Sequence, residues 1–220
     1  MPAVITIDGG SLTVGDVIAV ARGGATVALA KEACERMTRV RRVVDELVRS
    51  GSVVYGVTTG FGKLADVAIP AERLDELQTN LVRSHAIGVG PMLAEDETRA
   101  VMLLRANVLA KGLSGPRPVL VERVIALLNA QLYPPIPEQG SVGASGDLAP
   151  LAHVALALMG EGDLLHRGDR RTAAEWMRAR SIEPVSLGPK EGLAPDDRVE
   201  PDRTELRLAH GGRGTEDLGR

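Results

Sequence analysis

The sequence of 220 residues contains a single cysteine, Cys34, and only four aromatic residues. Because one cysteine cannot form a disulfide within the chain, it favours a reducing compartment, and we expect the protein to be cytoplasmic. With so few rings the core must be built mostly from aliphatic side chains. Two of the four rings, Tyr55 and Phe61, lie in one glycine-rich segment, which makes that segment a candidate for more than a connecting role.

The sequence also lacks a long hydrophobic run and a strong net charge. Its most apolar stretch, residues 148–159, contains His153 and is shorter than the ~20 residues that a membrane-spanning helix needs. The N-terminus has no basic and apolar blocks of a signal peptide. A net charge of -3 gives no reason to expect nucleic acid or an anionic membrane as a partner. No metal-ligand spacing, P-loop or dinucleotide fingerprint occurs, so neither a metal nor a dissociable cofactor is expected.

Helical periodicity dominates what is present. Apolar positions at helical spacing, opposite a charged face, predict one long helix over residues 26–49. Asp16 is expected to cap a helix over residues 17–22, and Asp147 to cap an apolar helix over residues 148–159. Further helices are predicted over residues 70–85, over residues 95–111 with an amphipathic pattern, from Pro116 or Pro118 to about Gln131, and over residues 172–180. In the first of these, spacings of three, four and four residues place Leu74, Leu77, Leu81 and His85 on one face. Strands are expected only at residues 4–7 and in a small hairpin near residues 164–172. The predicted fold class is therefore mainly α with a few short strands.

The composition changes after Ala194. Residues 195–220 have few apolar side chains, charges of both signs and no sustained period, a pattern typical of disorder. We therefore expect two parts, a folded region over residues 1–194 and a disordered tail over residues 195–220.

The strongest motif is GSVGASGDLAPLAH, residues 140–153. Ala144 and Gly146 are small enough for the backbone to fold tightly on itself, and Ser145 between them carries a hydroxyl that can leave. Asp147 then starts a helix, whose N-terminal partial positive charge favours electron density at this point. A plain glycine-rich helix cap would explain Ala-Ser-Gly alone but not fourteen residues. A serine-hydrolase elbow would need a glycine where Asp147 stands.

Two further motifs carry candidate site residues. YGVTTGFGKLAD, residues 55–66, places Tyr55 on a glycine-rich loop, where a tyrosine can be positioned against a ligand or can simply fasten the loop to the core. LQTNLVRSHAIGVG, residues 77–90, ends a predicted helix with Ser84 and His85. By itself His85 could equally be a core histidine or one that interacts with the C-terminal helix dipole.

Taken together, the three motifs resemble those of the ammonia-lyases that act on histidine and the aromatic amino acids. The similarity runs from about residue 3 to Ala194. It implies that Ala144, Ser145 and Gly146 close into a protein-derived 4-methylidene-imidazol-5-one by ring formation and two dehydrations. It also implies an acid/base role for Tyr55 and a substrate-selecting role for Ser84 and His85. A Ser-His pair is similar to the histidine-specific members, which implies elimination of ammonia from L-histidine to give trans-urocanate, in a homotetramer.

The resemblance stops abruptly at Ala194, where family members continue with an asparagine-containing loop and a long helical half. A truncated gene or an altered reading frame is expected to produce such a junction. We therefore expect this chain to have little activity alone, with the apolar faces of helices 26–49 and 148–159 left exposed. Two alternatives stay open: a phenylalanine or tyrosine ammonia-lyase or aminomutase of the same family, and a non-catalytic helical remnant.

Overall fold

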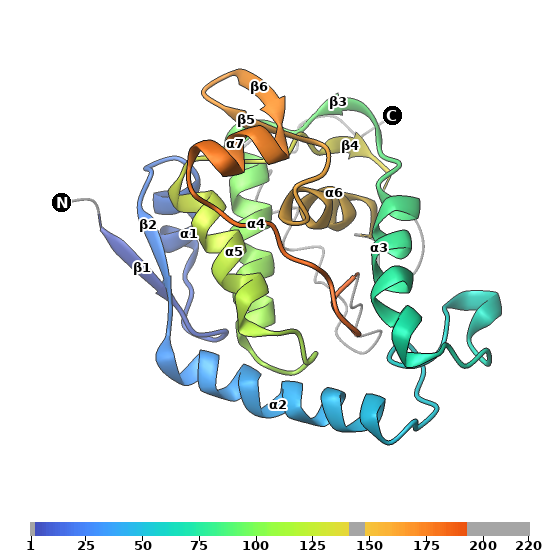
Figure 1. Cartoon of the computed structure of the whole chain (residues 1–220). Coiled ribbons are helices and arrows are strands. Elements are labelled where there is room, and N and C mark those ends of the chain that lie inside the picture. The colour runs from blue at the N-terminus through green and yellow to red at the C-terminus, as the bar shows by residue number, and fades with distance from the viewer. Residues whose placement is uncertain (1–2, 141–147, 193–220) are drawn as a thin grey trace, which may run out of the picture.

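The computed structural model describes residues 3–140 and 148–192 of the chain (Figure 1). The predicted cofactor loop with Ala144, Ser145 and Gly146 lies outside the described residues, as do the expected cap Asp147 and the tail over residues 195–220. In the part described, seven α-helices are joined by short strands. The predicted mainly α class is confirmed.

The helices are α1 (Val14–Ala21), α2 (Lys31–Arg49), α3 (Leu74–His85), α4 (Glu95–Ala110), α5 (Pro118–Asn129), α6 (Leu148–Leu158) and α7 (Ala173–Ala179), with short 3-10 turns at Gly62–Leu64 and Ala71–Arg73. The strands form three pairs. These are β1 (Val4–Ile7) with β2 (Thr26–Leu29), β3 (Val89–Met92) with β4 (Pro137–Gln139), and β5 (Asp163–His166) with β6 (Asp169–Thr172). The first pair is parallel and the other two are antiparallel.

The predicted long helix over residues 26–49 is wrong at its start. Residues 26–29 form β2, which pairs with β1, and the helix begins only at Lys31. The side-chain amide of Asn129, at the end of α5, completes the strand: its Oδ1 accepts from the Val27 N–H at 2.8 Å and its Nδ2 donates to the Val27 carbonyl at 2.9 Å. Asn129 lies about a hundred residues away in sequence, so local periodicity could not indicate this contact.

The first helix also begins earlier than predicted. Thr13 is its cap, and Asp16 stands at the third helical position, where the two side chains form a reciprocal capping box. Asp16 therefore stabilises the helix start without being the cap itself.

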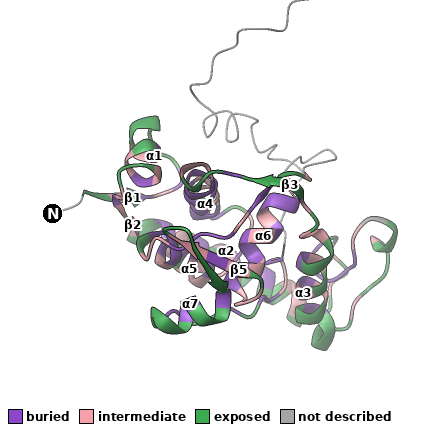
Figure 2. Cartoon of the chain, turned by 90° about the horizontal axis from the view of Figure 1, so that it is seen from above, coloured by how far each residue is buried: buried purple, intermediate pink, exposed green. Residues whose placement is uncertain are grey.

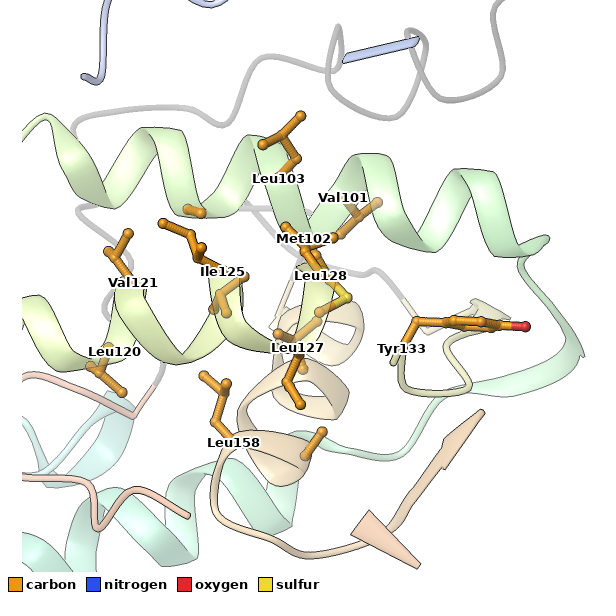
Figure 3. Packing of buried hydrophobic residues seen from close by; sticks show 14 of the residues in the cluster. Val101, Met102, Leu103, Leu120, Val121, Ile125, Leu127, Leu128, Tyr133 and Leu158 are labelled. Carbon is orange, nitrogen blue, oxygen red and sulfur yellow. The ribbon is translucent and has the colours of Figure 1, made fainter. Parts of the chain in front are cut away.

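The core is aliphatic and centres on α4 and α5. The prediction that residues 95–111 form an amphipathic helix is wrong in its pattern, because α4 is buried along most of its length between α1, α2 and α5 (Figure 2). Figure 3 shows leucine, valine and isoleucine side chains of α4 and α5 packed against each other and against Leu158 of α6. The aliphatic core expected from the scarcity of rings is thus confirmed.

The expectation that residues 148–159 would leave an apolar face exposed is wrong. Within α6, most residues are buried, including Ala152, Val154 and Leu158, because the helix packs against α3, α5 and the segment after α7. In α2 the result is mixed, since Met37 and Val44 are buried whereas Val43 is 58% exposed. The described part therefore covers more of its own apolar surface than expected.

Candidate active site

The two ends of the predicted cofactor loop are held by close backbone contacts. Gly140, the last described residue before the loop, packs so tightly that an added Cβ would lie 2.9 Å from the Cα of Gly88 and 3.2 Å from the Cβ of Ala149. Gly88 in turn leaves only 3.0 Å between an added Cβ and the ring of Pro137. Position 140 therefore requires glycine, and Gly88 leaves little room for a side chain. The chain enters the loop beside the first turn of α6, where it leaves the loop.

The pairing of β3 with β4 produces this approach. Val89 pairs with Gln139 and Met92 with Pro137, and an irregularity in register lies between the two pairs. Because β3 follows α3 after only three residues, the same ribbon brings the C-terminal end of α3 close to the start of the loop. Sequence reasoning missed this ribbon, since glycine and proline are poor strand formers and its partners are far apart in sequence.

Ser84 and His85 end α3 on this side of the molecule. The Nδ1 of His85 lies 2.8 Å from the carbonyl oxygen of Leu81 and 3.1 Å from the Oγ of Ser84, which itself donates to the Leu81 carbonyl at 2.8 Å. A carbonyl can only accept, so Nδ1 must carry a hydrogen. In the neutral ring Nε2 is then the acceptor, and Ser84 helps to keep it so.

The buried face of α3 differs from the predicted one. The face was expected to run through Leu74, Leu77, Leu81 and His85, but the fully buried positions are Leu74, Gln78 and Val82. Leu81 and His85 lie at the border of that face and are half-buried. His85 is thus accessible from solvent, as a residue that contacts a substrate must be.

Tyr55 lies in an irregular loop between α2 and α3, as predicted. Two buried threonines give the loop its shape: the Oγ1 of Thr58 donates to the Ser52 carbonyl at 2.5 Å, and the Oγ1 of Thr59 accepts from the Gly56 N–H at 3.3 Å. Tyr55 itself is 52% exposed and meets Phe61 edge to face, with ring centroids 6.0 Å apart. Hydrogen bonds of these threonines therefore fix the backbone of the loop, and the ring of Tyr55 is exposed to solvent.

The structure does not bring Tyr55 together with the Ser84–His85 pair. The loop that carries Tyr55 joins the N-terminal end of α3, whereas His85 is at the other end (Figure 1). A helix of 12 residues is roughly 18 Å long. Among the described residues, no hydrogen bond or ring contact links Tyr55 to Ser84 or His85.

The other histidines play different parts. For His153 the apolar helix around it predicts a satisfied core histidine, but its Nε2 is buried without a hydrogen-bond partner among the described residues, and burial lowers its pKa. His166 packs on Trp176 in the hairpin region, at 5.3 Å between ring centroids.

No group of three or more His, Cys, Asp or Glu side chains in the described ranges is placed to hold a metal. None of the described helices is both long and apolar enough to cross a membrane.

Sequence reasoning also missed a buried carboxylate. Glu191 has no exposed side-chain surface and is bound by Arg117 and Arg41. A charged residue between two glycines in the segment GPKEGLA was the available signal, but its partners lie on distant helices and could not be named from the sequence.

Comparisons of sequence agree with the motifs. A family model described as aromatic amino acid lyase matches residues 12–195. The histidine ammonia-lyase of Geobacillus sp. (strain WCH70) is 50% identical over 190 residues, which cover 86% of this chain and 37% of that protein. The histidine ammonia-lyase of Bacillus subtilis (strain 168) is 48% identical, with the same two shares covered. The chain thus spans little more than a third of the length of these relatives.

Comparisons of structure give the same result. The tyrosine aminomutase from Streptomyces globisporus matches with a TM-score of 0.81 and 43% identity, over 88% of this chain and 36% of that one. The histidine ammonia-lyase from Trypanosoma cruzi matches with a TM-score of 0.79 and 41% identity, over 87% and 37% of the two chains. Since sequence and fold agree over most of its length, the chain belongs to the aromatic amino acid lyase family.

Proposed function

We propose that this chain is the N-terminal part of an ammonia-lyase that converts L-histidine to trans-urocanate and ammonia. The identity of 50% with the histidine ammonia-lyase of Geobacillus sp. (strain WCH70) carries the proposal. In this proposal residues 1–194 are the lyase region and residues 195–220 a tail outside it. The whole enzyme is expected to be a cytoplasmic homotetramer.

Residues Ala144, Ser145 and Gly146 would form a 4-methylidene-imidazol-5-one, an electrophile that captures the substrate amine. The described surroundings of the loop fit such a group. Gly140 and Ala149 lie close together at the two ends of the loop, since a Cβ added to Gly140 would be 3.2 Å from the Cβ of Ala149. Small residues at positions 144 and 146 would favour the tight backbone turn that cyclisation requires.

His85 supplies a physical reason for substrate choice. With Nδ1 fixed on the Leu81 carbonyl, Nε2 of the neutral ring can accept a hydrogen bond. The imidazole of histidine has an N–H to donate, whereas the phenyl ring of phenylalanine has none. If phenylalanine were bound, the Nε2 of His85 would be left without a hydrogen-bond donor. An unpaired buried acceptor of this kind strongly disfavours binding of phenylalanine.

The same argument does not separate histidine from tyrosine, because a phenol hydroxyl also donates. The similarity to a tyrosine aminomutase at 43% identity favours tyrosine as the second candidate. In either reaction Tyr55 would remove the β-proton as general base. That role is proposed from its motif, since the described residues keep Tyr55 and His85 at opposite ends of α3.

A chimera tests the proposed function. Residues 1–192 would be joined to the remaining part of the histidine ammonia-lyase of Geobacillus sp. (strain WCH70), and histidine, tyrosine and phenylalanine would be offered separately. We expect urocanate from histidine, detected by its ultraviolet absorbance, and no product from the Ser145→Ala chimera. Coumarate or β-tyrosine in place of urocanate would favour the second candidate. The 220-residue chain alone is expected to turn over far more slowly than the roughly one per second that is ordinary for enzymes.

A further inference from the structure

Residues 182–192, here called the strap, run from α7 across the face of α6 towards α2 and α3 (Figure 1). The strap is not a regular element, yet it is well packed, with Val185 and Leu187 buried. The Val185 N–H donates to the carbonyl of Leu158, at the end of α6, at 2.8 Å. One end of the strap is therefore fixed to the helix that follows the cofactor loop.

The other end of the strap is fixed by the carboxylate of Glu191. The side chain of Arg117 donates to it from Nε at 2.8 Å and from Nη2 at 2.5 Å, and Arg41 donates from Nη1 at 3.3 Å. The backbone N–H groups of Arg117 and Gly188 add two more bonds, each of 2.8 Å. This binding raises the pKa of Arg117. Because Arg41 lies on α2 and Arg117 caps α5, one buried charge joins three segments.

The strap also contacts α3 directly. The Gly192 N–H donates to the Oε1 of Gln78 at 2.8 Å, and an added Cβ on Gly192 would come within 3.0 Å of the Gln78 carbonyl oxygen. Gln78 is 1% exposed, and its Nε2 is buried with no partner among the described residues. Gln78 precedes His85 by two turns on the same helix.

The strap thus connects the two helices on which the cofactor loop depends. α3 leads through β3 and β4 to Gly140, at the start of the loop, and α6 begins at its end. We propose that Glu191 is a positioning residue for cofactor formation: its buried carboxylate holds the strap, which fixes α6 relative to α3 and so keeps the ends of the loop together. This inference rests on the proposed function.

The step that Glu191 would favour is a ring closure without any oxidant. The amide nitrogen of Gly146 bonds to the carbonyl carbon of Ala144, and the carbonyl oxygen leaves as water with the amide hydrogens of Gly146 and Ser145. The hydroxyl of Ser145 then leaves as water with its own α-hydrogen. The mass of the peptide that spans these residues falls by two water molecules, which reports the step directly and needs no enzymatic activity.

The test compares Glu191→Gln with Glu161→Gln in the 220-residue chain. Glu161 makes a two-bond ion pair with Arg83, at 2.6 and 3.0 Å, and so also links α3 to the end of α6, but it does so at the surface. We expect the peptide to be dehydrated in the wild type and in Glu161→Gln. In Glu191→Gln the dehydrated fraction should fall at least about tenfold.

Two further variants separate positioning from general stability. Val121→Ala removes a fully buried core side chain that makes no hydrogen bond to the strap, and it should keep the dehydration even if its melting temperature falls as much as that of Glu191→Gln. If Glu191→Gln does not fold by circular dichroism, Gln78→Met is the deciding variant, because it frees the strap from α3 and leaves an apolar side chain of similar size.

The outcomes distinguish the two claims. A wild-type peptide of unmodified mass would overturn the proposed cofactor, and with it this inference. A dehydrated wild type, together with a folded Glu191→Gln or Gln78→Met that is dehydrated to the same extent, would overturn the positioning role and leave the proposed function standing. Equal loss in Val121→Ala would also overturn it, because the effect would then be one of stability alone.

Discussion

The two tyrosines of the chain lie in opposite surroundings. Tyr133 is 7% exposed, and its hydroxyl donates to the Oε2 of Glu95 at 3.1 Å. Burial, together with Glu95, raises the pKa of Tyr133 to about 12, so this tyrosine stays neutral. Tyr55 is 52% exposed on a loop that is held by other side chains. The contrast separates a tyrosine that serves the core from one that is available to a substrate.

The same contrast holds for the regions around them. Around Tyr133, α4 and α5 form a closed core, in which even the guanidinium of Arg99 is buried and donates to carbonyls at the ends of α1 and α5. At the two ends of α3, by contrast, large apolar side chains remain exposed on the loop of Tyr55 and on the segment after His85: Val53, Leu64, Val67, Ile87, Val89 and Met92. Substitutions in the core should therefore change stability, and those on the site side should change chemistry.

The largest expected effect is on the two tyrosines themselves. In the chimera with the Geobacillus enzyme, Tyr55→Phe should lower kcat by about 10²–10⁴-fold, the usual contribution of a general base. Tyr133→Phe should leave kcat almost unchanged, because it removes one hydrogen bond away from the site. Steady-state assays with histidine measure both. An equal loss of kcat in Tyr55→Phe and Tyr133→Phe would contradict the distinction between the two tyrosines.

The next effect concerns the core alone. Leu128 is 1% exposed and packs between α4 and α5 (Figure 3). Leu128→Ala should lower the free energy of unfolding by about 2–5 kcal/mol, since it leaves a cavity in a closed core. Urea denaturation of the 220-residue chain measures the change. A loss below about 0.5 kcal/mol, ordinary for surface positions, would show that this core is loosely packed.

A smaller effect is expected at His85, the residue proposed to contact the substrate. In the chimera, His85→Leu should lower kcat/KM for histidine by about 10–200-fold, because the imidazole N–H of the substrate loses its acceptor. The variant should unfold at nearly the same urea concentration as the wild type. An unchanged kcat/KM would remove His85 from the site.

The smallest effect is a dependence of stability on alkaline pH. The pKa of Tyr133 is raised from 10.0 to about 12 in the folded protein, so folding favours its neutral form. Its contribution is complete below about pH 10 and is lost as the pH rises towards about 12. Tyr133→Phe should therefore lose less stability over this range than the wild type in urea titrations. Parallel losses would mean that Tyr133 ionises as easily as in the unfolded chain.

How much of the fold the sequence predicts depends on how local each cause is. The hairpin of β5 and β6 and the helix α7 are correctly predicted, each to within one residue, because their signals lie within a few residues. The strand at Thr26–Leu29 is missed because its partners are β1 and Asn129. The burial of α6 was likewise not predicted, since it depends on the strap and on α3.

The candidate site divides in the same way. Tyr55 and the Ser84–His85 pair are predicted from contiguous motifs. Their arrangement was not, because it depends on the length of α3 and on the ribbon of β3 and β4. Glu191 was missed altogether, since its partners Arg117 and Arg41 are 74 and 150 residues away in sequence. A contiguous motif identifies candidate residues, whereas their arrangement in space depends on long-range packing.

The most direct test of the account is the mass of the peptide that spans residues 144–146 in the purified chain. The account predicts a peptide lighter by two water molecules than its sequence requires, and a peptide of full mass in the Ser145→Ala variant. A wild-type peptide of full mass, in a chain shown to be folded, would contradict the claim that these residues form the cofactor.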